Sequence, residues 1–158
     1  MTDVYVRIHL DTPAGALRVD GHGLPSVELV RAPGSAADRH TPIGTRDAAL
    51  LALTVDGRPA GLRPARGRLS RRSYRVDATV DGRRYRLVPC SYGESRLTRD
   101  GRRIGTLEST GDGRVDAGWE PDADALDQAL GTALAAGFGT GAQPWWHTAV
   151  EIVSELLP

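Results

Sequence analysis

Apolar and polar side chains alternate along several short stretches of the first 119 residues, a pattern typical of half-buried β-strands. The clearest stretch is residues 74–80, in which every second side chain is apolar and the others are charged or polar. Asp81-Gly82 follows it, and the alternation then resumes through residues 84–87. Because Asp and Gly tolerate the positive φ angles of a type I′ turn, this segment predicts a β-hairpin with Tyr74 and Tyr85 facing inward.

The same turn dipeptide recurs along the chain, with Asp at positions 20, 56, 81, 100 and 112. Further alternating segments at residues 5–10, 16–19, 27–30, 51–55 and 96–107 predict more strands around these turns. Residues 32–44 and 59–67 are rich in Pro, Gly and Ala and are predicted to be loops. The pattern therefore predicts an antiparallel β-meander over residues 1–119.

After Gly118 the apolar spacing becomes helical. Four large apolar side chains recur at every fourth position, at Leu126, Leu130, Leu134 and Phe138. Residues 129–138 carry no charge, and a helix that is apolar all round is usually buried all round. Pro121 suits a first helical position, and Asp122 and Asp124 place negative charge near the positive end of the helix dipole. We expect a buried helix over residues 121–138.

A second, amphipathic helix is predicted over residues 145–157, with four interface candidates on its apolar side: Trp145, Trp146, Val150 and Val153. A chain of 158 residues suits a single domain. The predicted fold is mainly β, of the α+β class. An antiparallel β-meander barrel packs around or against the hydrophobic C-terminal helix, and the amphipathic helix follows it.

The formal net charge of zero hides two unlike regions. Residues 58–114 carry 15 Arg and 6 acidic side chains, whereas residues 115–158 carry no Arg and 7 acidic side chains. All basic residues are Arg, so a P-loop lysine and a Schiff-base lysine are excluded. The single cysteine excludes an internal disulfide and a multi-cysteine zinc site. The N-terminal residues lack a long apolar core, so we expect a soluble, cytoplasmic protein without a secretory signal.

Arginines cluster around the predicted hairpin and form the main candidate site for anions: Arg68, Arg71, Arg72, Arg75, Arg84 and Arg86. A planar guanidinium grips phosphate in two-point fashion, so neighbouring strands would concentrate several such groups in one patch. The expected partner is an anionic phospholipid or membrane surface. Nucleic acid ranks lower, because only 5% of residues are aromatic and base stacking needs aromatics. The alternatives are a solvated face or neutralisation by the acidic C-terminal region.

The order of short hairpins followed by an uncharged helix resembles the tubby C-terminal-like superfamily, which includes the LURP-one-related proteins and the phospholipid scramblases. The resemblance is carried by Tyr74-Arg75-Val76, the hairpin at residues 80–85, the strand at residues 104–107 and the helix at residues 122–138. It implies a closed β-barrel wrapped around a hydrophobic C-terminal helix, and binding of anionic lipid. It identifies no catalytic or metal-binding residue.

These observations favour a non-enzymatic β-barrel domain that binds anionic phospholipid or a protein partner through its arginine-rich hairpin. One alternative is a small ligand-carrying barrel or enzyme with an internal cavity. Another is a structural or oligomerisation module, including a homodimer, that uses the amphipathic helix. The four histidines are scattered, without the paired spacing of a zinc site, and we identify no catalytic residue, metal ligand or cofactor. Cys90 is expected to be a small core residue.

Overall fold

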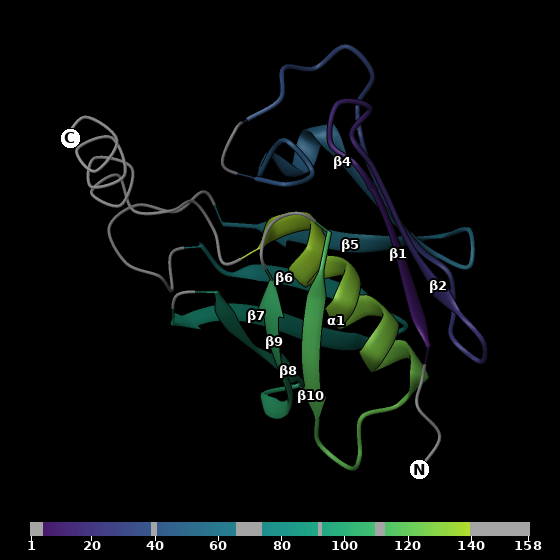
Figure 1. The fold of residues 1–158 in the computed structure, drawn as a ribbon, viewed down its shortest axis with the longest axis vertical. Coiled ribbons are helices and arrows are strands. Elements are labelled where there is room, and N and C mark those ends of the chain that lie inside the picture. Colours follow the sequence, from purple (N-terminus) through teal and green to yellow (C-terminus); the bar gives the residue numbers. More distant parts are fainter. Residues whose placement is uncertain (1–4, 39–40, 66–73, 92, 110–112, 140–158) are drawn as a thin grey trace, which may run out of the picture.

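A computed structural model describes residues 5–38, 41–65, 74–91, 93–109 and 113–139, which contain ten β-strands, one 3₁₀ turn and one α-helix (Figure 1). The strands are β1 (Val6–Asp11), β2 (Ala16–Gly21), β3 (Val27–Arg31), β4 (Leu51–Val55), β5 (Arg58–Pro64), β6 (Val76–Val80), β7 (Arg83–Ser91), β8 (Glu94–Arg99), β9 (Arg102–Ser109) and β10 (Val115–Trp119). The 3₁₀ turn η1 is Ala48–Leu50, and the helix α1 is Ala125–Phe138.

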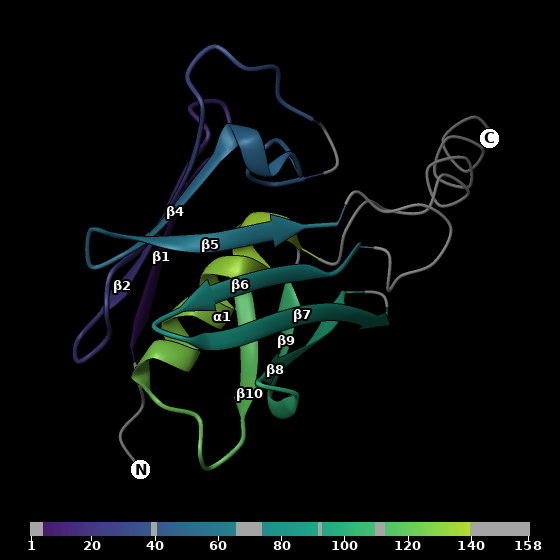
Figure 2. The same ribbon diagram turned by 180° about the vertical axis from the view of Figure 1, so that it is seen from behind.

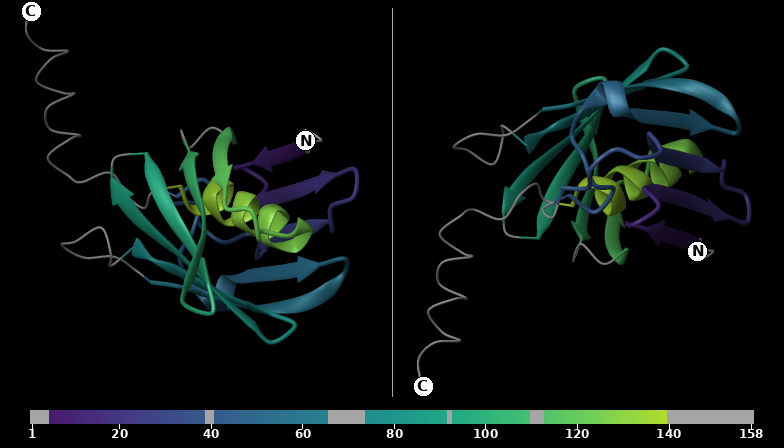
Figure 3. Two further views of the ribbon diagram at one scale, coloured as in Figure 1. Left: turned by 90° about the horizontal axis from the view of Figure 1, so that it is seen from below. Right: turned by 90° about the horizontal axis from the view of Figure 1, so that it is seen from above.

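Each strand pairs antiparallel with the next, in the spatial order β1 to β10, so the predicted meander is confirmed. The sheet curls around α1, which lies on its concave side (Figure 3). Within the described strands no ladder joins β1 to β10, and the sheet is therefore an open half-barrel. The closed barrel implied by the resemblance is not seen in this part of the chain.

Three of the five Asp-Gly dipeptides form the two-residue turns that were predicted. Asp56, Asp81 and Asp100 have φ of 49°, 49° and 51°, and the glycine after each also has positive φ, as a type I′ turn requires. The prediction is wrong for Asp20, which lies within β2 and forms ion pairs with Arg7 and Arg18. Asp112 lies outside the described residues.

Strand β5 occupies residues that were predicted to be a loop. Its first half pairs with β4, at Arg58 to Ala60, and its second half pairs with β6, at Gly61 to Pro64. Each half of β5 pairs with only one neighbouring strand. A proline, which has no N–H to donate, is therefore tolerated on the unpaired side. The two prolines and the glycine therefore do not interrupt the strand, although their composition indicated a loop. The predicted loop at residues 32–44 contains no strand in its described part.

Helix α1 is buried on all sides, as its apolar composition predicted. Every residue from Ala129 to Phe138 is buried, and Leu130 and Leu134 are fully inaccessible to solvent. The helix backbone approaches the sheet most closely at Gly131, where an added Cβ would lie 2.6 Å from Cδ2 of Leu97 and 2.8 Å from Cη2 of Trp119. The helix thus fills the concave side of the sheet, the space that an internal ligand cavity would need.

The predicted helix start at Pro121 is wrong, because the helix begins at Ala125. Asp124 is the N-cap, and its carboxylate accepts a hydrogen bond from the Asp127 N–H while the Asp127 carboxylate accepts one from the Asp124 N–H. This reciprocal capping box satisfies two backbone N–H groups at the start of the helix and fixes the start at Ala125. In the described part of the chain, no helix has the length and apolar character needed to cross a bilayer. The predicted helix at residues 145–157, with its four interface candidates, lies outside the described residues.

Candidate functional site

The alternation of side chains along the strands divides the arginines into two groups. Arg83 and Arg99 have the same parity as the inward-facing Tyr85 and Leu97 and stand at the ends of β7 and β8. Both therefore point toward the N-terminal end of α1. There they meet Asp127, whose side chain is fully buried.

Four donors surround the Asp127 carboxylate. The Tyr85 hydroxyl donates to Oδ1 at 2.6 Å, Arg83 Nη1 donates to Oδ1 at 3.2 Å, and Arg99 Nη1 donates to Oδ2. The N–H of Asp124 donates to Oδ2 at 2.9 Å. Burial, together with the hydrogen bond to Asp127, raises the pKa of Tyr85. Because both carboxylate oxygens are occupied by the protein's own donors, we interpret this cluster as a structural clamp between α1 and the sheet.

Three other acidic residues, which lie just before α1, also pair with arginines, and one of these arginines is again Arg83. Arg83 Nη1 lies 2.7 Å from Oδ2 of Asp124, and Arg102 Nε lies 3.3 Å from Oδ2 of Asp122. Arg103 Nε and Glu120 Oε1 are 3.8 Å apart. The acidic segment, residues 120–127, thus neutralises four arginines of the basic region, as one of the sequence-based alternatives proposed. Of the arginines on the opposite face of the sheet, it pairs with Arg103 alone among the described residues.

The clamp makes stability depend on pH through Asp124. Burial raises the pKa of Asp124, but hydrogen bonds from the Asp127 N–H and from Arg83 outweigh it and leave the pKa below its usual value. A carboxyl whose folded pKa is lowered stabilises the fold above its unfolded pKa, about 3.9, and this contribution is lost as the pH falls through the folded pKa. We expect Asp124→Asn, which keeps a good N-cap, to lower the urea midpoint at pH 7.

The difference in midpoint between wild type and Asp124→Asn should shrink as the pH is lowered below about 4. Urea denaturation at neutral and acidic pH, followed by circular dichroism, measures it. A difference that stays constant with pH would show that Asp124 does not titrate with folding.

The arginines of opposite parity on β5 to β9 lie on the outer surface of the sheet, away from α1. Figure 2 shows β5, β6 and β7 from this outer side, with α1 behind them. One cross-strand row is formed by directly paired residues of five strands: Arg63, Asp77, Arg86, Thr98 and Arg103. The next row contains Gly61, Thr79 and Arg84, with the Arg84 N–H bonded to Asp100 Oδ1 at 2.9 Å. Arg75 and Arg96 are also exposed on this surface.

We call this outer surface of β5 to β9 the arginine face. It carries six arginines, namely Arg63, Arg75, Arg84, Arg86, Arg96 and Arg103, against four carboxylates, Asp77, Asp100, Glu94 and Glu108. Clustering of one sign of charge raises the local concentration of oppositely charged ligands. The face is therefore suited to bind an anion.

A hollow of about 740 Å³ lies on the arginine face over β5 to β8, and we call it the β5–β8 hollow. Its polar lining includes Arg63, Arg84, Arg86, Asp77, Asp100, Thr79 and Thr98. Arg86 Nε donates to Asp77 Oδ1 at 2.7 Å, and Arg75 Nε lies 3.7 Å from the other oxygen of Asp77. The Asp77 carboxylate raises the pKa of Arg86. Within the described residues, no carboxylate pairs with Arg63 or Arg84.

Three of the six arginines predicted as anion ligands, Arg75, Arg84 and Arg86, lie on this one face, with the exposure that the alternation predicted. Arg68, Arg71 and Arg72 belong to the connection between β5 and β6 and lie outside the described residues. Arg63 was not predicted, because residues 59–67 were interpreted as a loop. Arg96 was not predicted either, although its outward parity in β8 could have identified it.

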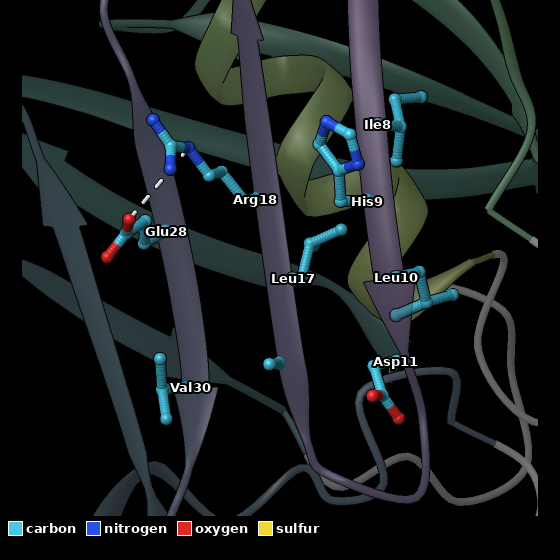
Figure 4. A pocket seen from close by; sticks show the side chains of 9 residues that line it. Ile8, His9, Leu10, Asp11, Leu17, Arg18, Glu28 and Val30 are labelled. Carbon is cyan, nitrogen blue, oxygen red and sulfur yellow. Dashed lines mark ion pairs between the residues drawn. The ribbon is translucent and has the colours of Figure 1, made fainter.

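A second hollow, of about 580 Å³, lies over β1, β2 and β3 (Figure 4). Its cation, Arg18, lies 3.1 Å from Asp20 and 4.0 Å from Glu28. His9 and Asp11 also line it, with the exposed side chain of Val30. Since its arginine is already matched by two carboxylates, this hollow is less suited to an anionic ligand than the β5–β8 hollow.

Cys90 is exposed, which corrects the prediction of a core cysteine. It lies in β7 beside an irregularity of register between Pro89 and Ser91, and its Sγ is 3.5 Å from Oε1 of Glu94. Burial of the thiol and the nearby Glu94 raise the pKa of Cys90, so it carries less of the reactive thiolate than an ordinary cysteine. Among the described residues, no group of three His, Cys, Asp or Glu side chains is placed to hold a metal ion.

Comparison with known proteins found no matching protein family, no matching curated protein and no matching solved structure.

Proposed function

We propose that this domain binds anionic phospholipid surfaces through the arginine face. The observation that carries the proposal is the excess of arginine over carboxylates on one outer surface of the sheet. The resemblance to the tubby C-terminal-like superfamily implies the same kind of ligand. The inward-facing arginines are neutralised by the acidic segment, so they do not enter the proposal.

The expected attraction is electrostatic. Each basic side chain near an anionic membrane surface contributes about 1 kcal/mol, and the contribution falls off within a Debye length. The arginines of this face that lack an ion pair within the described residues, Arg63, Arg84 and Arg96, should contribute most. Arg86 should contribute less, because Asp77 already balances part of its charge.

Wild-type protein should co-sediment with vesicles containing phosphatidylserine at low salt, and not with pure phosphatidylcholine vesicles. The triple variant Arg63→Gln, Arg84→Gln and Arg96→Gln should bind the acidic vesicles about a hundredfold more weakly, since it lacks three arginines worth about 1 kcal/mol each. Raising the salt concentration should weaken wild-type binding as well.

The matched control is the triple variant Arg7→Gln, Arg18→Gln and Arg58→Gln. It has the same change in net charge, but each of these arginines is ion-paired and stands off the arginine face. It should bind nearly as well as the wild type. Equal binding of the wild type to acidic and neutral vesicles would overturn the proposal, and equal losses in the two variants would remove the arginine face from it.

A ligand inside the barrel is less well supported as a function, because Leu130 and Leu134 of α1 occupy the concave side of the sheet. The oligomerisation alternative depends on Trp145, Trp146, Val150 and Val153, which lie outside the described residues.

A further inference from the structure

We infer that the β5–β8 hollow is a binding site for a single terminal phosphate group, held between Arg63 and Arg84. The inference rests on the proposed function, because it names the headgroup chemistry that the arginine face recognises. A phosphomonoester is the ligand class: a phosphate that ends a headgroup and has three terminal oxygens. Asp77, which lines the hollow, determines which arginines are available to bind this phosphate.

The shape of the hollow follows from the strands beneath it. Arg63 lies on β5 and Arg84 on β7, with Thr79 of β6 between them and paired to Arg84. Two strand spacings across the sheet and two residues along it put their Cα atoms about 12 Å apart, a span that two arginine side chains can close over one phosphate. Gly61, opposite Thr79, has no side chain, and a Cβ there would lie 3.4 Å from Cβ of Thr79. The floor between the two arginines is therefore low and open.

The charges of the hollow fit a doubly charged group. Arg86 and Arg75 share the Asp77 carboxylate, and Asp100 is held against the backbone of Arg84. The lining itself carries three arginines and two aspartates, and Arg75, which stands beside the hollow and shares Asp77, brings the net charge to +2. A phosphomonoester carries nearly two negative charges at pH 7, whereas a phosphodiester carries one. The hydroxyls of Thr79 and Thr98, which also line the hollow, add two uncharged donors.

Asp77 acts as a specificity-determining residue in this arrangement. Its carboxylate engages Arg86 at 2.7 and 3.4 Å, so Arg86 is not available to grip an anion without breaking that pair. It also repels an anion that enters the hollow. Arg63 and Arg84 are left as the two guanidiniums that can bind phosphate in two-point fashion. Removal of the Asp77 charge should therefore increase affinity for phosphate, although it breaks an ion pair of the protein.

The test measures binding to vesicles of phosphatidic acid, a phosphomonoester lipid, and of phosphatidylglycerol, a phosphodiester lipid, each mixed into phosphatidylcholine at equal surface charge. Soluble glycerol 3-phosphate, titrated and followed by NMR, provides the lipid-free arm. Wild type should prefer phosphatidic acid to phosphatidylglycerol. It should also bind glycerol 3-phosphate with shifts confined to the amides of β5, β6 and β7.

Arg63→Gln and Arg84→Gln should each weaken binding to phosphatidic acid about tenfold, the effect of losing one charge-assisted contact. Arg96→Gln is the matched control, since Arg96 is exposed on the same face, also lacks a carboxylate partner within the described residues, and does not line the hollow. It should weaken binding by about fivefold at most, the electrostatic share of one arginine near an anionic surface. Asp77→Asn should strengthen binding about threefold, as expected for removal of one negative charge some 8 Å from the phosphate.

Equal losses in the three arginine variants, or equal binding to the two acidic lipids, would overturn the hollow as a site while leaving the proposed function intact. Weaker binding of phosphatidic acid by Asp77→Asn would overturn the role of Asp77. No binding to any acidic vesicle would overturn the proposed function. If glycerol 3-phosphate still bound in that case, the hollow would stand as a site for a soluble phosphomonoester.

Discussion

Asp127→Asn should destabilise the domain more than any other change of a charged residue discussed above. The Asp127 carboxylate is fully buried and accepts from Tyr85, Arg83 and Arg99. A neutral amide keeps one acceptor oxygen, but it turns the other into an NH₂ donor facing the protein's own donors and removes the charge that the two guanidiniums share. Removing one partner of a buried ionic cluster typically costs about 3–5 kcal/mol. Urea denaturation at pH 7 should show a loss of free energy of unfolding in this range.

Asp122→Asn is the matched control. Asp122 also pairs with arginine, at 3.3 Å from Arg102, but both side chains reach solvent, so the loss should stay below about 1 kcal/mol. If Asp127→Asn does not fold, Tyr85→Phe removes a single hydrogen bond to the same carboxylate and should cost about 1.5–3 kcal/mol. A loss below 1 kcal/mol in both Asp127→Asn and Tyr85→Phe would contradict the interpretation of this cluster as a clamp.

The second large effect is expected at the other end of α1, for Phe138→Ala. The Phe138 ring is 1% exposed and is the last residue of the helix. The guanidinium of Arg46 lies between the rings of Tyr74 and Phe138, 5.3 and 5.5 Å from their centroids. Truncation leaves a cavity and removes one of these two cation–π contacts, so we expect a loss of about 3–5 kcal/mol.

Arg46 makes this position more sensitive than an ordinary core site. Burial lowers the pKa of Arg46 to about 10, and its Nε donates to the carbonyl of Ala65 at 2.7 Å. Phe138→Leu keeps an apolar side chain under the guanidinium and should cost less than half as much as Phe138→Ala. Thermal and urea unfolding of the two variants compares them. Equal losses would show that the volume next to Arg46 does not matter.

Much of the fold could be predicted from the sequence because its local signals agree. Alternation placed the strands around the hairpin at Asp81-Gly82, and the dipeptide identified three turns whose φ angles are positive. The uncharged stretch at residues 129–138 predicted a helix buried on all sides. The exception was β5, where Pro and Gly indicated a loop. Each half of β5 pairs with a different neighbour, and this pairing allows a strand that contains Pro and Gly.

The candidate site was predicted only in part. The outward parity of Arg75, Arg84 and Arg86 follows from alternation alone, and the structure confirms their exposure. The ion-pair partners of these three arginines do not follow from the alternation. Asp77 engages Arg86, whereas Arg84 receives no carboxylate in the described part of the chain, and this difference depends on side-chain geometry across two strands.

The sequence by itself determined which side of the sheet Arg75, Arg84 and Arg86 occupy, because side chains alternate strictly along a strand. It also determined that the charges of the two regions are opposite. Only the tertiary structure decided which arginines the acidic segment neutralises. The capping box places Asp127 inside the curl of the sheet, where Arg83 and Arg99 can reach it. Ion pairs need contact within a few ångströms, so Arg63, Arg84 and Arg96 on the outer surface keep their charge for another partner.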